Sequence, residues 1–143
     1  MKAVWDWLAL PAVVRVTRST IGLVFVLAAL GKIGDLPWFG QQLHNYHLAP
    51  LWAENAIAIT TPWIELLAGL ALVLNVRARA GAVITFAAMI VFTLAVAAAW
   101  ARGLDFNCGC FGKLGAATIG ARKFAENVGL TLVAALALRE PRG

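Results

Sequence analysis

Long apolar runs separated by short polar stretches dominate this chain of 143 residues. Residues 80–101 form an uncharged run, and residues 56–76 carry a single charge, that of Glu65. An α-helix rises about 1.5 Å per residue, so about 20 apolar residues are needed to cross a hydrocarbon core about 30 Å thick. The pattern therefore predicts a membrane-spanning helix over each of these two ranges.

Two further apolar runs are shorter. Only 13 uncharged residues separate Arg18 from Lys32, and only 12 separate Glu126 from Arg139. The loops between the four runs are too short to hold a soluble domain, so we expect all four runs to cross and to carry charged side chains into the membrane. The sequence thus predicts an all-α fold, an integral-membrane four-helix bundle in a single domain covering residues 1–143. The expected spans are approximately residues 16–36, 56–76, 80–101 and 118–138.

The first 19 residues resemble a secretory signal only in part. Asp6 and Pro11 interrupt their apolar portion, and a small-residue cleavage site is not recognisable. We expect instead a short N-terminal helix that lies in the membrane interface, with Trp5 and Trp7 at the level of the lipid headgroups.

Composition supports a membrane protein. Hydrophobic residues make up 62% of the chain and charged residues 13%, with a mean hydropathy of +0.81, outside the range of soluble domains. The net charge of +5 raises the question of nucleic-acid binding. The basic residues, however, fall at the ends of apolar runs and form no stripe, which argues against a nucleic-acid partner and is typical of segments that flank membrane helices.

The same basic residues predict the orientation. With four crossings, seven lie on the side of both termini and five on the opposite side, which favours cytoplasmic termini in a bacterial inner membrane. The only two cysteines, Cys108 and Cys110, then lie on the outer face, where disulfides persist. The seven are Lys2, Arg15, Arg18, Arg77, Arg79, Arg139 and Arg142; the five are Lys32, Arg102, Lys113, Arg122 and Lys123.

One carboxylate lies deep in a predicted span. Glu65 is about nine residues from the outer end of its span and is too short to reach the headgroups, so it needs a partner, for which Lys32 is the candidate. Arg122 and Glu126 have the i,i+4 spacing of a helical ion pair, and Asn127 follows them. We expect these five residues to support a polar pocket beneath the cysteine loop. The alternative is that Lys32, Arg122 and Lys123 extend to the headgroups.

The segment FNCGCFG, residues 106–112, contains both cysteines. A disulfide between Cys108 and Cys110 closes a very small ring whose preferred torsion is hard to meet, and strained, exposed disulfides exchange readily. The pattern therefore favours thiol–disulfide exchange, with these cysteines as the catalytic residues of a possible oxidoreductase. It does not indicate which cysteine attacks.

Three alternatives stay open. His44 and His47 have an H-x-x-H spacing on the same predicted side as Cys108 and Cys110, and two imidazoles with two thiolates suit zinc or copper, as in a metal-binding or metal-transport protein. The cysteines can also be inert small residues. The chain can also be an assembly factor that recognises a client without redox turnover.

The chain resembles the MauE/DoxX family of redox-associated membrane proteins, and its cysteine pair places it nearest the methylamine-utilisation MauE branch. The resemblance implies four membrane helices and disulfide chemistry outside the cytoplasm. In that branch it implies maturation of the cysteine-rich small subunit of methylamine dehydrogenase, together with a thioredoxin-like partner. The matching residues are Arg18, Gly22, Phe25, Gly31, Lys32, Phe39, Tyr46, Pro50, Pro62, Glu65, residues 108–112 and Asn127.

The terminal electron acceptor is a further open point. Membrane thiol oxidoreductases that reduce quinone commonly use two cysteine pairs, and this chain has one. The candidate cofactor is a bound quinone lined by Lys32, Glu65 and Trp63, although Trp63 equally suits an anchor at the membrane interface.

Overall fold

Helices make up most of the described part of the chain. The computed structural model describes residues 1–108 and 118–140. Its elements are α1 (Lys2–Leu8), α2 (Pro11–Ile33), α3 (Leu36–Asn45), α4 (Leu51–Val73), α5 (Ala78–Ala101) and α6 (Ala121–Ala137). Within these described ranges the only β-type pairing is an isolated bridge between Asn107 and Thr118. The prediction of an all-α fold is confirmed.

Among the described helices, α2, α4 and α5 are long and apolar enough to cross a membrane. Leu27, Leu67 and Leu94 on these helices are each at least 49% exposed, as expected of side chains whose solvent is lipid. The bilayer is therefore the environment of this protein. The last helix, α6, is shorter at 17 residues and begins with charged side chains.

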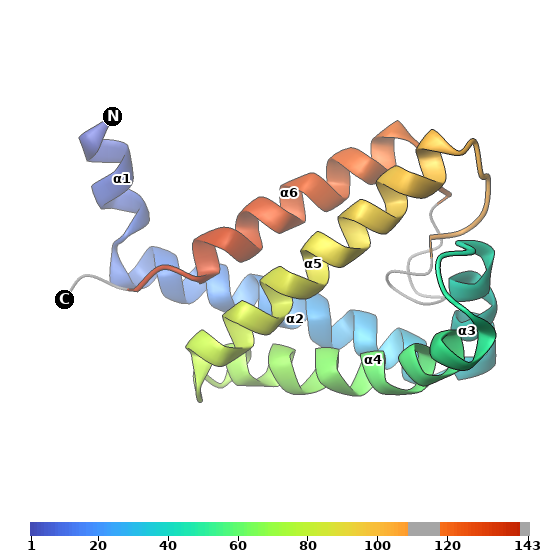
Figure 1. Cartoon of the computed structure of the whole chain (residues 1–143). Helices are drawn as coiled ribbons and strands as arrows, with labels where there is room; N and C mark the ends of the chain where they lie inside the picture. Colours follow the sequence, from blue (N-terminus) through green and yellow to red (C-terminus); the bar gives the residue numbers. More distant parts are fainter. Residues whose placement is uncertain (109–117, 141–143) are drawn as a thin grey trace.

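Four helices pack against one another: α2 contacts α4 and α6, and α5 also contacts α4 and α6 (Figure 1). The α2–α4 crossing is close because glycines face each other. A Cβ atom on Gly69 would lie 2.7 Å from the carbonyl oxygen of Gly22, and one on Gly22 would lie 2.8 Å from that of Gly69. Small residues permit such close approach of two membrane helices.

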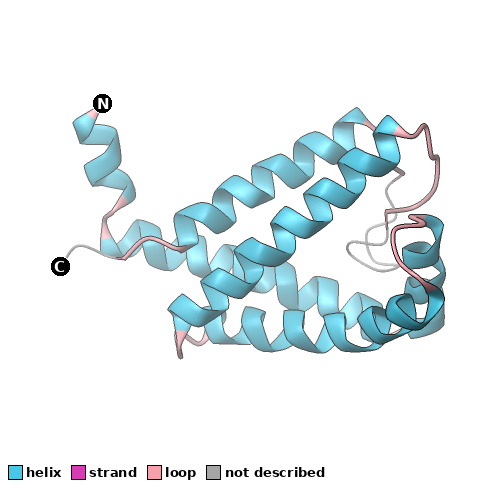
Figure 2. Cartoon of the chain, viewed as in Figure 1, coloured by secondary structure: helices cyan, strands magenta, loops and turns pink. Residues whose placement is uncertain are grey.

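The two ends of the molecule differ. The connection between α3 and α4 and the residues that follow α5 lie at the same end, which we call the α3 end (Figure 2). At the opposite end, a short turn joins α4 to α5, and Gly81 packs against the Ala68 carbonyl oxygen, 2.9 Å from where its Cβ would be. From this turn α4 and α5 diverge toward the α3 end (Figure 1).

A charged side chain inside α2 is explained by α6. Arg18 donates from Nε to the Ala137 carbonyl oxygen at 3.0 Å and from Nη2 to the Arg139 carbonyl oxygen at 3.1 Å. The last carbonyls of a helix have no partner within the helix itself. Arg18 therefore supplies hydrogen-bond donors to carbonyl groups at the end of α6. These carbonyl groups in turn offset part of the desolvation free energy of the guanidinium in α2.

The first helix, α1, packs only lightly on the rest. Trp5 and Trp7 are more than half-exposed, and the Arg139 guanidinium lies 4.6 Å from the centre of the Trp5 ring. Its location in the membrane interface stays a prediction.

Candidate functional site

The pairing predicted for the deep carboxylate is present. Lys32 Nζ, at the end of α2, donates to Glu65 Oε1 at 2.7 Å and to Oε2 at 2.8 Å. Lys32 is fully buried and Glu65 is 2% exposed. An ammonium that reaches both oxygens of one carboxylate offsets part of the desolvation of both groups, which is what allows them to remain inside a helix bundle.

Two aromatic rings complete the surroundings of the ammonium. Lys32 Nζ lies 5.0 Å from the centre of the Phe39 ring and 4.7 Å from that of Phe92. The faces of aromatic rings carry partial negative charge and attract cations, most strongly where water is excluded. Helices α2, α3, α4 and α5 thus each contribute a side chain to one buried cluster.

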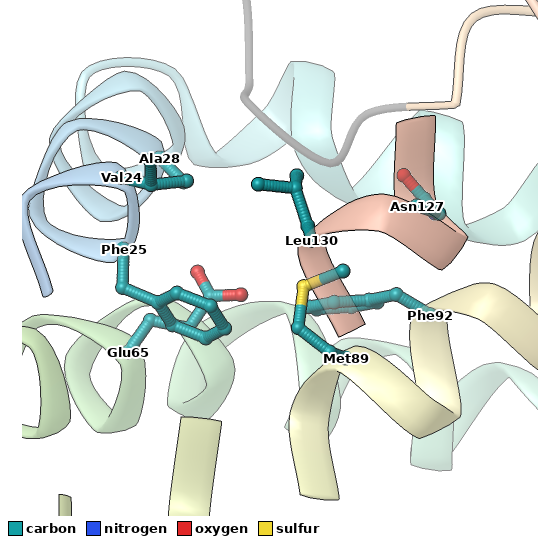
Figure 3. A pocket seen from close by; sticks show the side chains of 8 residues that line it. All are labelled: Val24, Phe25, Ala28, Glu65, Met89, Phe92, Asn127 and Leu130. Atoms are coloured by element: carbon teal, nitrogen blue, oxygen red, sulfur yellow. The ribbon is translucent and has the colours of Figure 1, made fainter. Parts of the chain in front are cut away.

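Asn127 of α6 lies near this cluster. Its Nδ2 atom is buried and has no hydrogen-bond partner among the described residues. Asn127 and Glu65 line the same cavity of about 20 Å³, on different sides of it (Figure 3). This volume holds about one water molecule, which could bond to both groups.

The other predicted supporting residues lie elsewhere. Arg122 Nε is 3.4 Å from Glu126 Oε1, so the predicted i,i+4 pair is present, but the Arg122 side chain is 95% exposed. Lys123 is buried, and its Nζ is 3.6 Å from Glu126 Oε2. The structure therefore brings together Lys32, Glu65 and Asn127 and leaves Arg122 at the surface.

Cys108 is buried at the α3 end. The Tyr46 hydroxyl donates to the Cys108 carbonyl oxygen at 2.7 Å, and the Tyr46 ring meets the Phe106 ring edge-on at 4.7 Å between centres. Arg102 Nη1 in turn donates to the Tyr46 carbonyl oxygen at 2.8 Å. These contacts fix the backbone at Cys108 to the segment that follows α3.

The base of the cysteine loop is closed by backbone contacts. Asn107 bridges to Thr118, and the Ile119 amide donates to the Phe106 carbonyl oxygen at 3.0 Å. Cys110, the second predicted catalytic residue, lies outside the described residues.

The two histidines make contacts of their own. His44 Nδ1 lies 2.7 Å from Glu54 Oε2, and the His44 and His47 rings are 5.3 Å apart between centres. Within residues 1–108 and 118–140, no three His, Cys, Asp or Glu side chains are grouped as ligands for a metal ion. Cys110, the fourth member of the set considered for a metal, is outside these ranges.

A large pocket lies between the diverging helices α4 and α5. Its volume is about 610 Å³, and its walls are mostly apolar. Trp63, which the sequence suggests as a quinone contact, is half-exposed and is not among the residues that line this pocket. The polar residues that line the pocket are Tyr46, Glu54, Thr61, Glu65 and Cys108.

Sequence reasoning did not assign a role in the site to Tyr46, Glu54, Phe39 or Phe92. Glu54 is in the first turn of α4, where an acidic residue is ordinary because the helix dipole favours it. Aromatic residues in membrane segments are equally common. Their roles depend on which helices meet. The signals in the sequence were the position of Glu54 just before an apolar run and the presence of Phe39 and Tyr46 among the residues that resemble the family.

Comparison with known proteins gives the family. The family model described as "Methylamine utilisation protein MauE" matches residues 10–139. The chain belongs to the MauE family. Its relatives include the methylamine utilization protein MauE of Paracoccus denitrificans, 33% identical over 74% of this chain and 58% of the relative, and that of Methylorubrum extorquens, 33% identical over 73% and 56%.

Coverage of these MauE relatives is incomplete. The relative from Paracoccus versutus is 31% identical over 66% of this chain and 51% of its own length, so the chain spans about half the length of the curated relatives it matches. No solved structure matches the chain.

Proposed function

We propose that this chain is a membrane thiol–disulfide redox protein that supports disulfide formation in an extracytoplasmic client through Cys108 and Cys110. The observation that carries the proposal is the setting of Cys108. The Tyr46 hydroxyl donates to the Cys108 carbonyl oxygen, and Cys108 lines the α3 end of the pocket between α4 and α5. Cys108 therefore borders an apolar pocket and lies two positions before Cys110, its proposed redox partner.

The proposed chemistry is a two-step exchange. A client thiolate attacks the Cys108–Cys110 disulfide, whose S–S bond breaks as a mixed S–S bond forms. The client's second thiolate then attacks the mixed disulfide. The client gains a disulfide and is oxidised by two electrons, and Cys108 and Cys110 are left as thiols.

The proposed topology has four crossings, with α6 as the fourth. Both termini are cytoplasmic, α1 lies in the interface, and the α3 end faces the outer side of a bacterial inner membrane. Support comes from the contacts of α6 with α2 and α5 and from the excess of basic residues at the opposite end.

The proposed partners follow from the family. The relatives are named for methylamine utilisation, and the resemblance noted above points to the small subunit of methylamine dehydrogenase as client, with a thioredoxin-like protein as partner. Lys32, Glu65 and Asn127 would hold the helices in the arrangement that leaves the large pocket between α4 and α5. Arg122 and Glu126 would stabilise the start of α6.

The test is thiol trapping in spheroplasts of a bacterial host. A membrane-impermeant alkylating reagent is applied before and after reduction to the wild type, to Cys108→Ser and to Cys110→Ser, and the gel shift is read. We expect a reducible pair that is accessible from outside and a covalent adduct to another protein in one single variant.

Two results would contradict the proposal. Full client maturation by Cys110→Ser would favour a non-catalytic assembly factor. Thiols that stay reduced, form no adduct and are protected only by added zinc or copper would favour the metal set with His44 and His47.

A further inference from the structure

We infer that the pocket between α4 and α5 binds a lipid-soluble quinone, which accepts two electrons from Cys108 and Cys110. This inference rests on the proposed function and adds to it the class of the electron acceptor and the place where it binds. Of the three residues that the sequence suggested for a quinone site, Glu65 lines this pocket, Lys32 is bonded to Glu65, and Trp63 lies on another face of α4.

The shape of the pocket suits an elongated apolar molecule. Along α4 its lining extends from Glu54 to Glu65, which is about 16 Å at 1.5 Å per residue. The volume of about 610 Å³ is in the range of sites that bury small cofactors. Because α4 and α5 are held together at Gly81 and diverge from there, the space between them widens toward the α3 end.

The pocket is open to the lipid. Ile57 and Ile64 of α4 and Val83, Ile84 and Val91 of α5 line it and are each at least 41% exposed. Side chains that face both the pocket and the surface of the bundle form an entrance between the two helices. A ligand that is dissolved in the bilayer can therefore reach the pocket without crossing water.

Polar groups inside the pocket distinguish a quinone from a plain lipid chain. Thr61 carries a hydroxyl that can donate to a ring carbonyl, and it is one helical turn from Glu65, whose partner Lys32 provides a buried cation. An alkyl chain uses neither group. Cys108, at the α3 end of the same pocket, is the electron donor.

A quinone can accept the two electrons that Cys108 and Cys110 release when their disulfide forms again. The thiols of Cys108 and Cys110 each lose a proton, an S–S bond forms between them, and two electrons leave the pair. The quinone takes up the two electrons and two protons and becomes a quinol, its two carbonyls becoming hydroxyls. The restored disulfide can then oxidise the next client, and the quinol leaves into the bilayer.

The experiment uses the full chain, purified in detergent micelles and reduced beforehand. Decylubiquinone is added, because its fully substituted ring does not alkylate thiols. Quinol formation is followed by absorbance, and the thiols are counted by alkylation. Decylbenzene, which has the alkyl chain but no carbonyls, serves as a competitor.

Two variants and a matched control locate the site. Ala87→Phe places a ring in the pocket at an exposed position of α5. Thr61→Val removes the hydroxyl with little change of shape. Ala125→Phe makes the same change as the first at an exposed alanine of α6 that is outside the pocket lining.

We expect one quinol for each cysteine pair oxidised in the wild type and in Ala125→Phe. Ala87→Phe should slow the reaction at least tenfold. Thr61→Val should raise the quinone concentration for half-maximal rate about fivefold, the effect of one hydrogen bond of about 1 kcal/mol. Decylbenzene should compete poorly.

Other results would overturn the inference. The first is that the wild type forms no quinol. The second is that Ala87→Phe and Ala125→Phe slow the reaction equally. The third is that decylbenzene competes as strongly as a second quinone does while Thr61→Val has no effect. If mixed disulfides still form in spheroplasts while quinone is not reduced, only the quinone site fails and the exchange function stands.

Discussion

Single residues in this protein are stabilised by groups from distant parts of the chain. Lys32 and Glu65 are 33 positions apart, and Tyr46 and Cys108 are 62 positions apart. In a low-dielectric interior each such contact affects the free energy of unfolding in two ways. The contact itself is favourable, and its loss leaves a buried polar group without a partner. The two contacts differ in charge, so their loss should have different consequences.

Removing the carboxylate should destabilise the fold strongly. Glu65→Leu leaves the Lys32 ammonium buried and uncompensated, and we expect a loss of about 3–5 kcal/mol in the free energy of unfolding. The measurement is unfolding by a denaturing detergent from mixed micelles. The control is the double variant Lys32→Met with Glu65→Leu, which should recover most of the loss because both charges are gone; an equally unstable double variant would contradict the explanation.

Removing the tyrosine hydroxyl should act on the cysteine more than on the fold. Tyr46→Phe keeps the ring contact with Phe106 but loses the hydrogen bond to the Cys108 carbonyl oxygen, a cost of about 1 kcal/mol. We expect Cys108 to be alkylated faster, measured on reduced protein in the Cys110→Ser background. An unchanged alkylation rate would mean that Tyr46 does not hold the backbone at Cys108.

At the level of the helices, two close contacts decide the arrangement. Gly22 and Gly69 set the α2–α4 crossing, and Gly81 sets the start of α5 against α4. Helix α6 is short, but Arg18 of α2 completes its C-terminal hydrogen bonds. Small residues and end contacts thus position helices that also share a core of larger side chains, among them Ile21, Phe25 and Leu72.

Adding a methyl group to a glycine should destabilise the protein only where that glycine lies in a close contact between helices. Gly69→Ala places a Cβ 2.7 Å from the Gly22 carbonyl oxygen, where only backbone movement can relieve the clash, and we expect a destabilisation of about 1–3 kcal/mol. Gly129→Ala on α6 meets nothing within 4 Å, so helix propensity alone should make it neutral or stabilising by up to about 1 kcal/mol. Both are measured as detergent unfolding midpoints, and similar effects of the two changes would argue against the close α2–α4 crossing.

The whole molecule combines a tight end and a wide end. The helices meet closely near the α4–α5 turn and separate toward the α3 end, where the pocket, Glu54 and Cys108 are found. The proposed orientation places the wide end outside the cytoplasm, which is where a client's thiols would be met.

The orientation can be tested with single cysteines in a background that lacks Cys108 and Cys110. An impermeant reagent applied to spheroplasts should label Leu48→Cys, between α3 and α4. It should label Asn75→Cys, in the α4–α5 turn, and Glu140→Cys, after α6, only once the membrane is permeabilised. Labelling of Glu140→Cys from outside would show that α6 does not cross.

The family and the all-α fold could be predicted from the sequence, and so could the pairing of Lys32 with Glu65. A carboxylate deep in an apolar run must find a cation, and the chain offers few. Arg122 shows the limit of this reasoning: its spacing from Glu126 predicted the ion pair correctly, but spacing does not tell whether a residue on α6 faces the bundle or the surface.

The sequence by itself determined where the apolar helices lie, because length and hydropathy are properties of contiguous residues. It also determined that the chain's two cysteines are separated by one residue. Only the tertiary structure decided that α4 and α5 diverge and enclose a pocket, that Tyr46 holds Cys108, and that Glu54 meets His44. These features depend on the angles at which helices cross, and crossing angles are set by contacts between residues far apart in the chain.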